Sequence, residues 1–433
     1  MAKALRLFQT SKAPAVVDVE WAKHVLTSIN WSFSSPFSVG RSGMQLFDCR
    51  KYHWYPATFI PEIPYVLIEV LSKPDAIVYD PFAGIGTTIF QSLMLGRRPL
   101  ATEVCQVPVN IMRALWVLLN PDVDLSSVLT DIEQELSKYN EREDYTQCLS
   151  QVPVLANRLQ PWFTREAFNQ LSYLILYEQK SHTLGTKAVA RVSLSACLKA
   201  VCSQNRGWGC IADNMLPKPE QLKKDRSALD RFGRNARVLV NDLVRFKADM
   251  PLSTQELLRT VLPESAILHS DARHASEIKN ESIDLIVTSP PYPNMTDYAM
   301  SQRLSYYLFG AEPTKDLATE IGARRHRFWS DAIQRYKNDM IEVLQVIALR
   351  LKPGGYACFV MPTFDDVNKK NMIRKQSNMI RKQSVQECMA VLLSNDFVLE
   401  QELQRILPTR RRHHNQKWTS LEKEEIYIYR KLK

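Results

Sequence analysis

Glycine is scarce in this sequence, and three features that would define other classes of protein are missing. Only 13 of the 433 residues are glycine, whereas about 7% is usual, so any cluster of glycines is informative. The eight cysteines form no CxxC pair, which argues against a zinc site and against a disulfide framework. No segment approaches the roughly 20 apolar residues that span a bilayer, and the N-terminal residues lack the apolar stretch of a signal peptide. We therefore expect a cytoplasmic protein with reduced cysteines and no metal.

What is present is the composition of a globular protein with a basic balance. Hydrophobic residues make up 45% of the chain and charged residues 24%, which argues against a mainly disordered or fibrous protein. A chain of 433 residues is long enough for two or three units, or for one core with a large insertion. The net charge of +10 would attract a polyanion such as nucleic acid, although many soluble proteins are mildly basic without such a ligand.

Short apolar runs alternate with helical patterns in two parts of the chain. Candidate strands lie at residues 76–80, 98–104, 281–292 and 354–362, and a closing pair lies at 397–407 and 424–431. Residues 87–96 have the apolar spacing of a helix. Strands that alternate with helices predict an α/β fold with a doubly wound, largely parallel sheet, in which ligands bind at the carboxyl ends of the strands.

The alternation stops between the two parts, where apolar residues recur at helical spacing in residues 164–179, 189–204 and 226–246. We interpret residues 115–262 as a helical insertion between two halves of the core, residues 1–114 and 263–433. The later part of the insertion carries a run of basic residues that could follow a phosphate backbone or form a solvated helix face: Lys218, Lys223, Lys224, Arg226, Arg231, Arg234, Arg237 and Arg245.

The first glycine cluster, Gly84 with Gly86, lies in a turn between a candidate strand that ends at Asp80 and a candidate helix. Glycines allow a ligand to approach the backbone, and the first turn of the helix offers unpaired N–H groups. A GxG turn alone is weak evidence, because many parallel sheets contain such turns for packing.

The complete motif is more specific. The nonapeptide DPFAGIGTT at residues 80–88 resembles the cofactor motif of amino-methylating DNA methyltransferases, and TSPPYPNMTDY at residues 288–298 resembles their catalytic motif. The resemblance covers roughly residues 50–110 and 265–365 and implies a Rossmann-like core that binds S-adenosyl-L-methionine. The residues that it assigns to cofactor binding are Tyr55, Phe59, Pro61, Asp80, Pro81, Phe82, Ala83, Gly84, Gly86, Thr87, Thr88, Glu103, Asp271 and Ala272.

Two of these residues have a specific role in the family. The resemblance implies that Glu103 holds the ribose hydroxyls and that Asp271 lies near the adenine amino group. The segment from residue 52 to residue 61 resembles the element that packs over the methionine end of the cofactor. Without the motifs, Glu103 would be a surface carboxylate, Asp271 a turn or helix cap, and the aromatic segment part of the core.

The catalytic motif also makes chemical sense by itself. The lone pair of a base amino nitrogen is delocalised into the ring, and acceptors for its two protons would localise that pair. The hydroxyl of Ser289 and the carbonyl of Pro290 can be those acceptors, and Pro291 has no N–H that competes for the carbonyl. Tyr292 can stack on a base that has been rotated out of the duplex. The alternative is that Pro-Pro-Tyr merely ends a strand.

The resemblance favours one target without deciding it. A Ser at the first position of this motif is typical of N4-cytosine enzymes, and Asp or Asn of N6-adenine enzymes. Methylation at cytosine C5 would need a thiol nucleophile, usually in a Pro-Cys pair, and the sequence has no such pair.

The alternatives to a DNA methyltransferase are an RNA or protein amide methyltransferase and a non-catalytic DNA-binding protein. A cognate restriction endonuclease, in a restriction-modification system, would be a partner besides duplex DNA.

The motif order is permuted, because the cofactor motif precedes the catalytic motif, whereas most N4-cytosine enzymes have the reverse order. Target recognition therefore cannot be assigned by position. We expect DNA contacts from Arg206 and Trp208 in the insertion, and from Arg410, Arg411 and Arg412 in a loop between the last two strands. The alternatives are a bracing scaffold and a solvated turn. The heptapeptide NMIRKQS, repeated at residues 371–384, is interpreted as a duplication without function, and the alternative is a basic helix that faces DNA.

Overall fold

Seven strands in the described part of the chain form one sheet in the order β3-β2-β1-β4-β5-β7-β6. The structure is a computed structural model that describes residues 17–33, 46–203, 216–218, 220, 222, 226–363, 372–407 and 423–433. The strands are β1 (Ile77–Asp80), β2 (Arg98–Glu103), β3 (Ile267–His269), β4 (Ile283–Thr288), β5 (Leu351–Pro362), β6 (Phe397–Ile406) and β7 (Lys423–Lys431).

The first five strands of this order are parallel, and β7 runs antiparallel to both β5 and β6. The expected hairpin-like closing pair is therefore confirmed, as are the expected strands along the rest of the chain. The three-residue β3 was not expected, because it is too short to give an alternating pattern.

Helices cover both faces of the sheet, so the doubly wound α/β prediction is confirmed. Tyr79 and Ile286 belong to a hydrophobic cluster with α16 (Ala332–Arg350) and α17 (Met372–Leu393). Their neighbours Val78 and Leu285 belong to a second cluster with α2 (Val19–Ser28) and α3 (Glu62–Leu71). Successive strand residues point to opposite faces, and burial of each large apolar side chain contributes roughly 1.5–3 kcal/mol.

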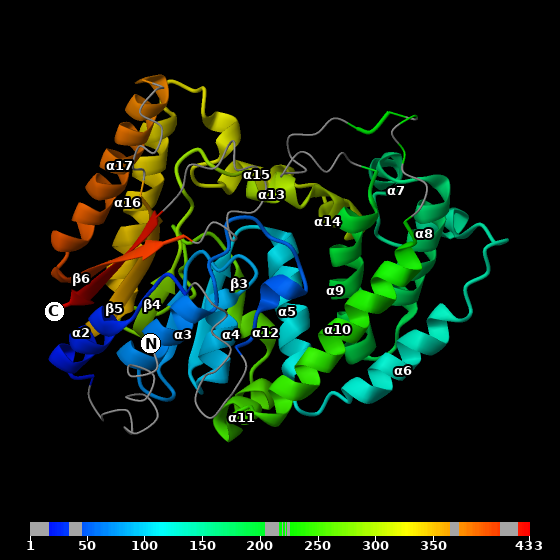
Figure 1. The fold of residues 1–433 in the computed structure, drawn as a ribbon, viewed down its shortest axis with the longest axis horizontal. Helices are drawn as coiled ribbons and strands as arrows, with labels where there is room; N and C mark the ends of the chain where they lie inside the picture. The colour runs from blue at the N-terminus through cyan, green and yellow to red at the C-terminus, as the bar shows by residue number, and fades with distance from the viewer. Residues whose placement is uncertain are drawn as a thin grey trace.

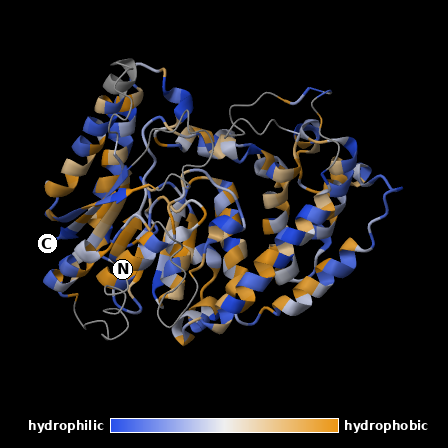
Figure 2. Ribbon diagram, viewed as in Figure 1, coloured by the Kyte–Doolittle hydropathy of each residue, from blue (hydrophilic) through white to orange (hydrophobic). Residues whose placement is uncertain are grey.

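The remaining helices form a layer beyond the β3 edge of the sheet, with α5 (Gln106–Leu119) between the sheet and this layer (Figure 1). The layer contains α6 (Leu125–Leu136), α7 (Ala156–Leu159), α8 (Arg165–Lys180), α9 (Leu184–Val201), α10 (Ala228–Ala248), α11 (Leu252–Thr260) and the 3-10 turns η3 (Tyr145–Gln151) and η4 (Gln160–Trp162). The short helix α12 (Pro263–Ala266) instead packs on β2, β3 and α5. Hydrophobic residues on these helices alternate with hydrophilic ones along each helix (Figure 2).

The helical layer shares its core with the sheet-bearing part. Phe90 of α4 (Thr87–Met94), Leu171 of α8 and Leu239 of α10 belong to the same cluster of buried residues. The expected boundary between residues 114 and 115 falls inside α5, which is one continuous helix. A division into three segments therefore stays an interpretation of the chain, because the packing is continuous across it.

The structure also shows the setting of the cysteines and of the NMIRKQS repeat. Of the seven cysteines that the structure describes, Cys148 alone is exposed, and all seven are free thiols. The described residues include no helix long and apolar enough to cross a membrane. Among the same residues, no group of three or more histidine, cysteine, aspartate or glutamate side chains could hold a metal ion. The NMIRKQS repeat lies in α17 from Met372 onward, and Asn371 lies outside the described residues.

Candidate active site

The turn between β1 and α4 is anchored by a buried carboxylate. Asp80, at the end of β1, has no exposed surface, and its Oδ1 accepts hydrogen bonds from the Phe82 amide at 3.0 Å and from the Thr288 hydroxyl at 2.6 Å. Burial raises the pKa of Asp80 to about 6, while the hydrogen bonds from the Thr288 hydroxyl and the Phe82 amide act against that rise. Asp80 thus joins the end of β1 to the end of β4, the strand that leads into Ser289.

Both glycines of the turn have a positive φ, which favours glycine, but a Cβ at each position would meet different neighbours. Gly84 has a φ of +53°, and a Cβ there would lie 3.2 Å from the ring of Tyr55. Gly86 has a φ of +91°, and a Cβ there would meet Met112 and Phe90 at 2.9 Å. Gly84 therefore keeps the wall of the pocket open, whereas Gly86 allows α4 to pack closely on its neighbours.

Glu103 ends β2 and connects it to the same turn. Its two carboxylate oxygens accept hydrogen bonds from the amides of Gly84 at 2.8 Å and Cys105 at 2.9 Å. The side chain is buried, and burial raises the pKa of Glu103 to about 7, although both amide hydrogen bonds lower it. Each oxygen keeps a lone pair for a further donor, so Glu103 can accept hydroxyl groups from a ligand in the pocket.

Asp271 and Ala272 follow the short strand β3 and lie on the wall of the same pocket. The carboxylate of Asp271 is paired with the guanidinium of Arg273, whose Nη2 lies 2.6 Å from Oδ2. Arg273 also binds Asp339 on α16 at 2.5 Å and donates to the carbonyl of Thr319 at 3.2 Å. The Asp271 loop is thereby held against the segment that forms the opposite part of the wall.

The segment from residue 52 to residue 61 brings aromatic side chains to the pocket. The ring of Tyr55 stacks on that of Tyr298, with ring centroids 5.8 Å apart and an interplanar angle of 24°. Phe59 also lines the pocket, whereas Pro61 lies at the start of α3, away from the wall.

The Ser-Pro-Pro-Tyr motif follows β4, and only part of it faces the pocket. Ser289 and Pro291 line the wall, whereas Pro290 and Tyr292 do not. The hydroxyl of Ser289 donates to the carbonyl of Val360 on β5 at 3.2 Å and lies 3.4 Å from the hydroxyl of Tyr292. Tyr292 is buried, and burial, followed by the nearby charge of Glu424, raises the pKa of its phenol.

These elements enclose one pocket with about 750 Å³ of space between the protein atoms, including its open mouth. Most of the residues predicted from the sequence lie on its wall: Tyr55, Phe59, Pro81, Phe82, Ala83, Gly84, Thr87, Glu103, Asp271, Ala272, Ser289 and Pro291. Six predicted residues lie outside the wall: Pro61, Asp80, Gly86, Thr88, Pro290 and Tyr292. Thr88, for example, is buried and donates to the carbonyl of Val287 at 3.1 Å, which ties α4 to β4.

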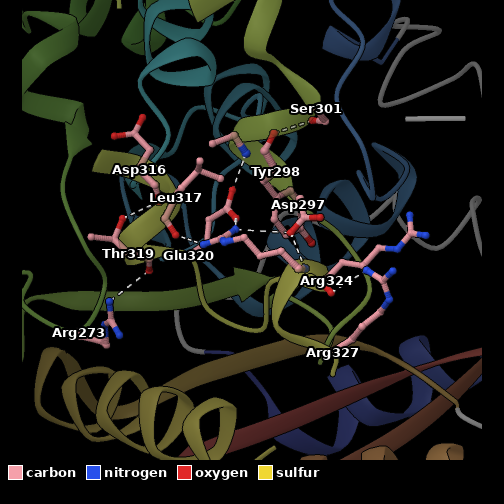
Figure 3. A network of polar contacts seen from close by, with 12 residues as sticks. Arg273, Asp297, Tyr298, Ser301, Asp316, Leu317, Thr319, Glu320, Arg324 and Arg327 are labelled. Carbon is pink, nitrogen blue, oxygen red and sulfur yellow. Dashed lines mark hydrogen bonds and ion pairs between the residues drawn. The ribbon is translucent and has the colours of Figure 1, made fainter. Parts of the chain in front are cut away.

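The wall also contains residues that the sequence did not reveal, among them Val104, Cys105, Tyr298 and the segment Thr319–Ile321. Tyr298 belongs to the quoted catalytic motif, so its aromatic ring was a usable signal. Glu320 had none, because no motif surrounds it. Its carboxylate accepts hydrogen bonds from the Ala299 amide and from Arg325, which also binds Asp297 (Figure 3). Burial raises the pKa of Glu320, and these hydrogen bonds lower it.

The expected DNA contacts stay predictions. Arg206, Trp208, Arg410, Arg411 and Arg412 lie outside the described residues. In the basic run of the insertion, Arg226 donates to the carbonyl of Ala200 at 2.8 Å, and Arg237 pairs with Glu133 at 2.8 Å. Both contacts are made within the helical layer.

Comparison with known proteins agrees with this geometry. The DNA methylase family model N6_N4_Mtase matches residues 20–142, which include the turn after β1 and Glu103. A Type II methyltransferase from Kocuria varians, M.MvaI, is 26% identical over 251 residues, which are 56% of this chain and 53% of that protein. A second, M.BsoBI from Geobacillus stearothermophilus, is 25% identical over 284 residues, 61% of this chain and 53% of that protein.

These matches support the resemblance to the amino-methylating DNA methyltransferase family that the two motifs indicate. It spans about half the length of the curated relatives that it matches. In this chain the glycine turn lies at residues 80–88 and the Ser-Pro-Pro-Tyr motif at residues 289–292, the permuted order seen in the sequence.

The similarity to this family implies S-adenosylmethionine as the methyl donor, and the pocket fits it. Gly84 leaves open the space that a Cβ would occupy beside Tyr55, and the buried carboxylate of Glu103 faces that space with acceptors for hydroxyl groups. The stacked rings of Tyr55 and Tyr298 provide an apolar surface on the same wall.

Proposed function

We propose that this chain transfers the methyl group of S-adenosylmethionine to an exocyclic amino group of a base in duplex DNA, with N4 of cytosine as the favoured target. The observation that carries the proposal is that Ser289 and Pro291 share one pocket wall with Gly84 and Glu103. A cofactor-type turn and an amino-group motif that are far apart in the sequence thus face the same space.

The residues of the pocket divide into a cofactor group and a base group. Glu103 and the turn around Gly84 would hold the cofactor, with the Tyr55 ring beside it. When bound, S-adenosylmethionine supplies an electrophilic methyl group on a sulfonium centre. Because the donor is already charged and reactive, the chain needs to position the acceptor nitrogen and does not need a strong base.

Ser289 is suited to accept a proton of the base amino group. Its own hydroxyl hydrogen is directed to the carbonyl of Val360 at 3.2 Å, so its lone pairs remain for an incoming N–H donor. The resemblance assigns the second amino proton to the carbonyl of Pro290, which would have to turn toward the pocket, because Pro290 does not line its wall. Acceptors on both protons localise the nitrogen lone pair and stabilise the positive charge that develops on the nitrogen as it attacks.

Tyr292 has a supporting role in this proposal. Its phenol lies near the Glu424 carboxylate and 3.4 Å from the Ser289 hydroxyl, and Glu424 itself is paired with Arg405 at 2.5 Å. We therefore assign Tyr292 to positioning Ser289. Tyr298, which does line the pocket, is the better candidate for stacking on an extruded base.

Cytosine is favoured over adenine because the motif begins with Ser289, as is typical of N4-cytosine enzymes in the family. Adenine N6 is the second candidate, and the same wall could present acceptors to its amino group. The relatives from Kocuria varians and Geobacillus stearothermophilus are named Type II methyltransferases, which supports a place for this chain in a restriction-modification system with a cognate endonuclease.

The test is incubation of the purified chain with unmethylated duplex DNA of mixed sequence and isotopically labelled S-adenosylmethionine, followed by mass spectrometry of the nucleosides. We expect labelled N4-methylcytosine. Labelled N6-methyladenine would keep the reaction and change the target. Label in RNA or protein but not in DNA, or consumption of no cofactor, would overturn the proposal in favour of an RNA or protein amide methyltransferase or a non-catalytic DNA-binding protein.

A further inference from the structure

The segment between α15 (Thr314–Thr319) and α16 combines arginines with exposed aromatic rings. We call residues 324–329, with the sequence Arg-Arg-His-Arg-Phe-Trp, the arginine-aromatic loop. It begins with a 3-10 turn, η7 (Arg324–His326), and follows directly on the pocket residues Thr319–Ile321.

Two rings of this loop are unusually exposed. Phe328 is 83% exposed and Trp329 is 48% exposed. The other large hydrophobic side chains that are exposed in the described part of the chain are all aliphatic. Exposed aromatic rings that stand together are typical of a binding surface, because their removal from water in a complex is favourable.

The loop is fixed to the backbone of the catalytic motif. Ala323 forms an isolated parallel bridge with Thr296, and the amide of Arg324 donates to the carbonyl of Thr296 at 3.2 Å. One residue further, the Arg325 amide donates to Asp297 Oδ1 at 2.9 Å. Because residues 289–298 carry both Ser289 and Tyr298, the loop has a fixed position at the edge of the pocket.

The charges of the loop fall into an inner and an outer set. Arg325 is the inner member, bound to Asp297 and to the buried Glu320. Arg324 and Arg327 extend together away from Glu320 (Figure 3), and the Arg327 guanidinium lies over the Phe328 ring, 4.4 Å from its centroid. The surface beside the rings is therefore cationic, which complements a polyanion.

The second exposed ring is held in a defined orientation. Trp329 stacks on His326, with ring centroids 3.9 Å apart and an interplanar angle of 21°. The guanidinium of Arg335 lies over the Trp329 ring, 5.2 Å from the ring centroid. Arg335 also pairs with Asp331 at 2.6 Å. A ring that is already ordered loses less conformational freedom when a base stacks on it.

We infer that the arginine-aromatic loop contacts duplex DNA at the target position. Arg324 and Arg327 bind phosphates, and the rings of Phe328 and Trp329 stack on the bases that are left exposed when the target base turns into the pocket. This inference rests on the proposed function and names the surface through which the same site engages DNA. Stacking of a base on an aromatic side chain is sequence-tolerant, so the loop contributes affinity without reading the sequence.

The test measures binding of the full chain to a fluorescent duplex of mixed sequence, by anisotropy, with either a perfect pair or one mismatched pair at the centre. A mismatched pair is easier to unstack, so the chain should prefer that duplex. Phe328→Ala should weaken binding to the mismatched duplex about tenfold, as expected for the loss of one stacked base, and should abolish the preference. Phe328→Leu keeps an apolar side chain without a stacking face and should behave like Phe328→Ala, whereas Phe328→Tyr should bind like the wild type.

Two matched controls lie on α11, at the opposite end of the molecule from α13 (Tyr298–Ser301) and α15 (Figure 1). Leu252 is 81% exposed, so Leu252→Ala removes a comparable exposed apolar side chain and should leave DNA binding unchanged. Arg259→Ala removes an exposed arginine that pairs with Asp122 at 3.0 Å. It should weaken DNA binding less than Arg327→Ala and should leave unchanged the salt dependence that Arg327→Ala reduces.

The outcomes separate this inference from the proposed function. Unchanged DNA affinity in Phe328→Ala and Arg327→Ala would overturn the inference, even if the wild type methylates DNA. So would a change in self-association of these variants, measured by sedimentation, without a change in DNA binding, because the loop would then contact a second copy of the chain. Loss of the mismatch preference in Phe328→Ala supports the inference even if no methyl group reaches DNA, a result in which only the proposed transfer fails.

Discussion

The amide of Gly84 donates a hydrogen bond to Glu103 Oε2 at 2.8 Å, and this bond joins the turn after β1 to the end of β2. The two strands are paired in parallel register up to Asp80 and Ala101, so their carboxyl ends lie at the same edge of the sheet. A ligand that touches the turn therefore also meets the carboxylate. The pocket is thus built on the carboxyl ends of two paired strands.

Gly84→Ala should weaken the binding of S-adenosylmethionine by about tenfold or more, which corresponds to about 1.4 kcal/mol. The new Cβ would lie 3.2 Å from the Tyr55 ring and would push that ring into the pocket. Isothermal titration calorimetry gives the affinity. Gly354→Ala is the matched control, because Gly354 also has a positive φ, +78°, but nothing lies within 4 Å of its Cβ position. Equal losses of affinity in both variants would contradict the placement of the cofactor beside Gly84.

Glu103 should make cofactor binding depend on pH. Its pKa is raised to about 7 by burial, and an ionised carboxylate accepts stronger hydrogen bonds from hydroxyl groups than a protonated one does. Affinity for S-adenosylmethionine should therefore rise as the pH increases through about 7 and then level off. Glu103→Gln should bind more weakly and without this rise. Calorimetric titrations at several pH values check both statements, and an unchanged pH profile in the variant would assign the ribose contact to another group.

The expected elements and the structure agree best where the pattern is long or the motif is specific. Residues 76–80 and 87–96 were expected as a strand and a helix, and β1 and α4 lie there. The alternation in residues 397–407 and 424–431 predicted the closing pair, because an edge hairpin with one solvated face has a clear period of two residues. The position of Gly84 and Glu103 in one pocket followed from the family motifs.

The remaining features depend on contacts between distant segments. Glu320 reaches the pocket because Arg273, beside Asp271, donates to the carbonyl of Thr319 at 3.2 Å, and no local pattern encodes that contact. Tyr292 turns toward Glu424 on β7, a strand that is far away in the sequence. The exposed rings of Phe328 and Trp329 also had no signal, because in the sequence they could equally be core residues.

The same burial of Glu103 should also be visible in the stability of the unliganded chain. The folded state binds the proton of Glu103 more tightly than the unfolded state, because its pKa is about 7 when folded and about 4.3 in an unfolded chain. The contribution to the free energy of unfolding is therefore greatest below the unfolded value, falls as pH rises between the two values, and is constant above the folded one. Asp80, with a pKa of about 6, adds a change of the same sign.

Urea unfolding at about pH 5 and about pH 8 tests this linkage. The decrease in the free energy of unfolding between these pH values should be smaller in Glu103→Gln than in the wild type. Glu256→Gln, an exposed position on α11, should leave the decrease unchanged. Burial lowers the pKa of His53 to about 4, so His53 makes the free energy of unfolding rise with pH. This contribution is the same in every variant and cancels when the variants are compared. An identical pH dependence in Glu103→Gln and the wild type would show that Glu103 is not buried as described.

Ser289→Ala should separate catalysis from cofactor binding. The Ser289 hydroxyl is directed to the carbonyl of Val360 on β5, and the Glu103 carboxylate that would hold the ribose is bound to other backbone groups. Loss of the hydroxyl should therefore leave the calorimetric affinity for S-adenosylmethionine within about twofold of the wild type. Removal of one hydrogen-bond acceptor at a reacting group should lower kcat by about 100-fold, by analogy with the loss of one donor at an oxyanion.

Ser282→Ala is the control for Ser289→Ala, because the Ser282 hydroxyl also donates to a backbone carbonyl, that of Lys279 at 2.7 Å, just before the same strand β4. Single-turnover rates of methyl transfer should be normal in Ser282→Ala and strongly reduced in Ser289→Ala. If both the cofactor affinity and the rate fell equally in Ser289→Ala, the hydroxyl would act on the shape of the pocket through its bond to Val360. If neither fell, the acceptor for the amino proton would have to be sought elsewhere, for example at the side chains of Tyr298 and Glu320 on the same wall.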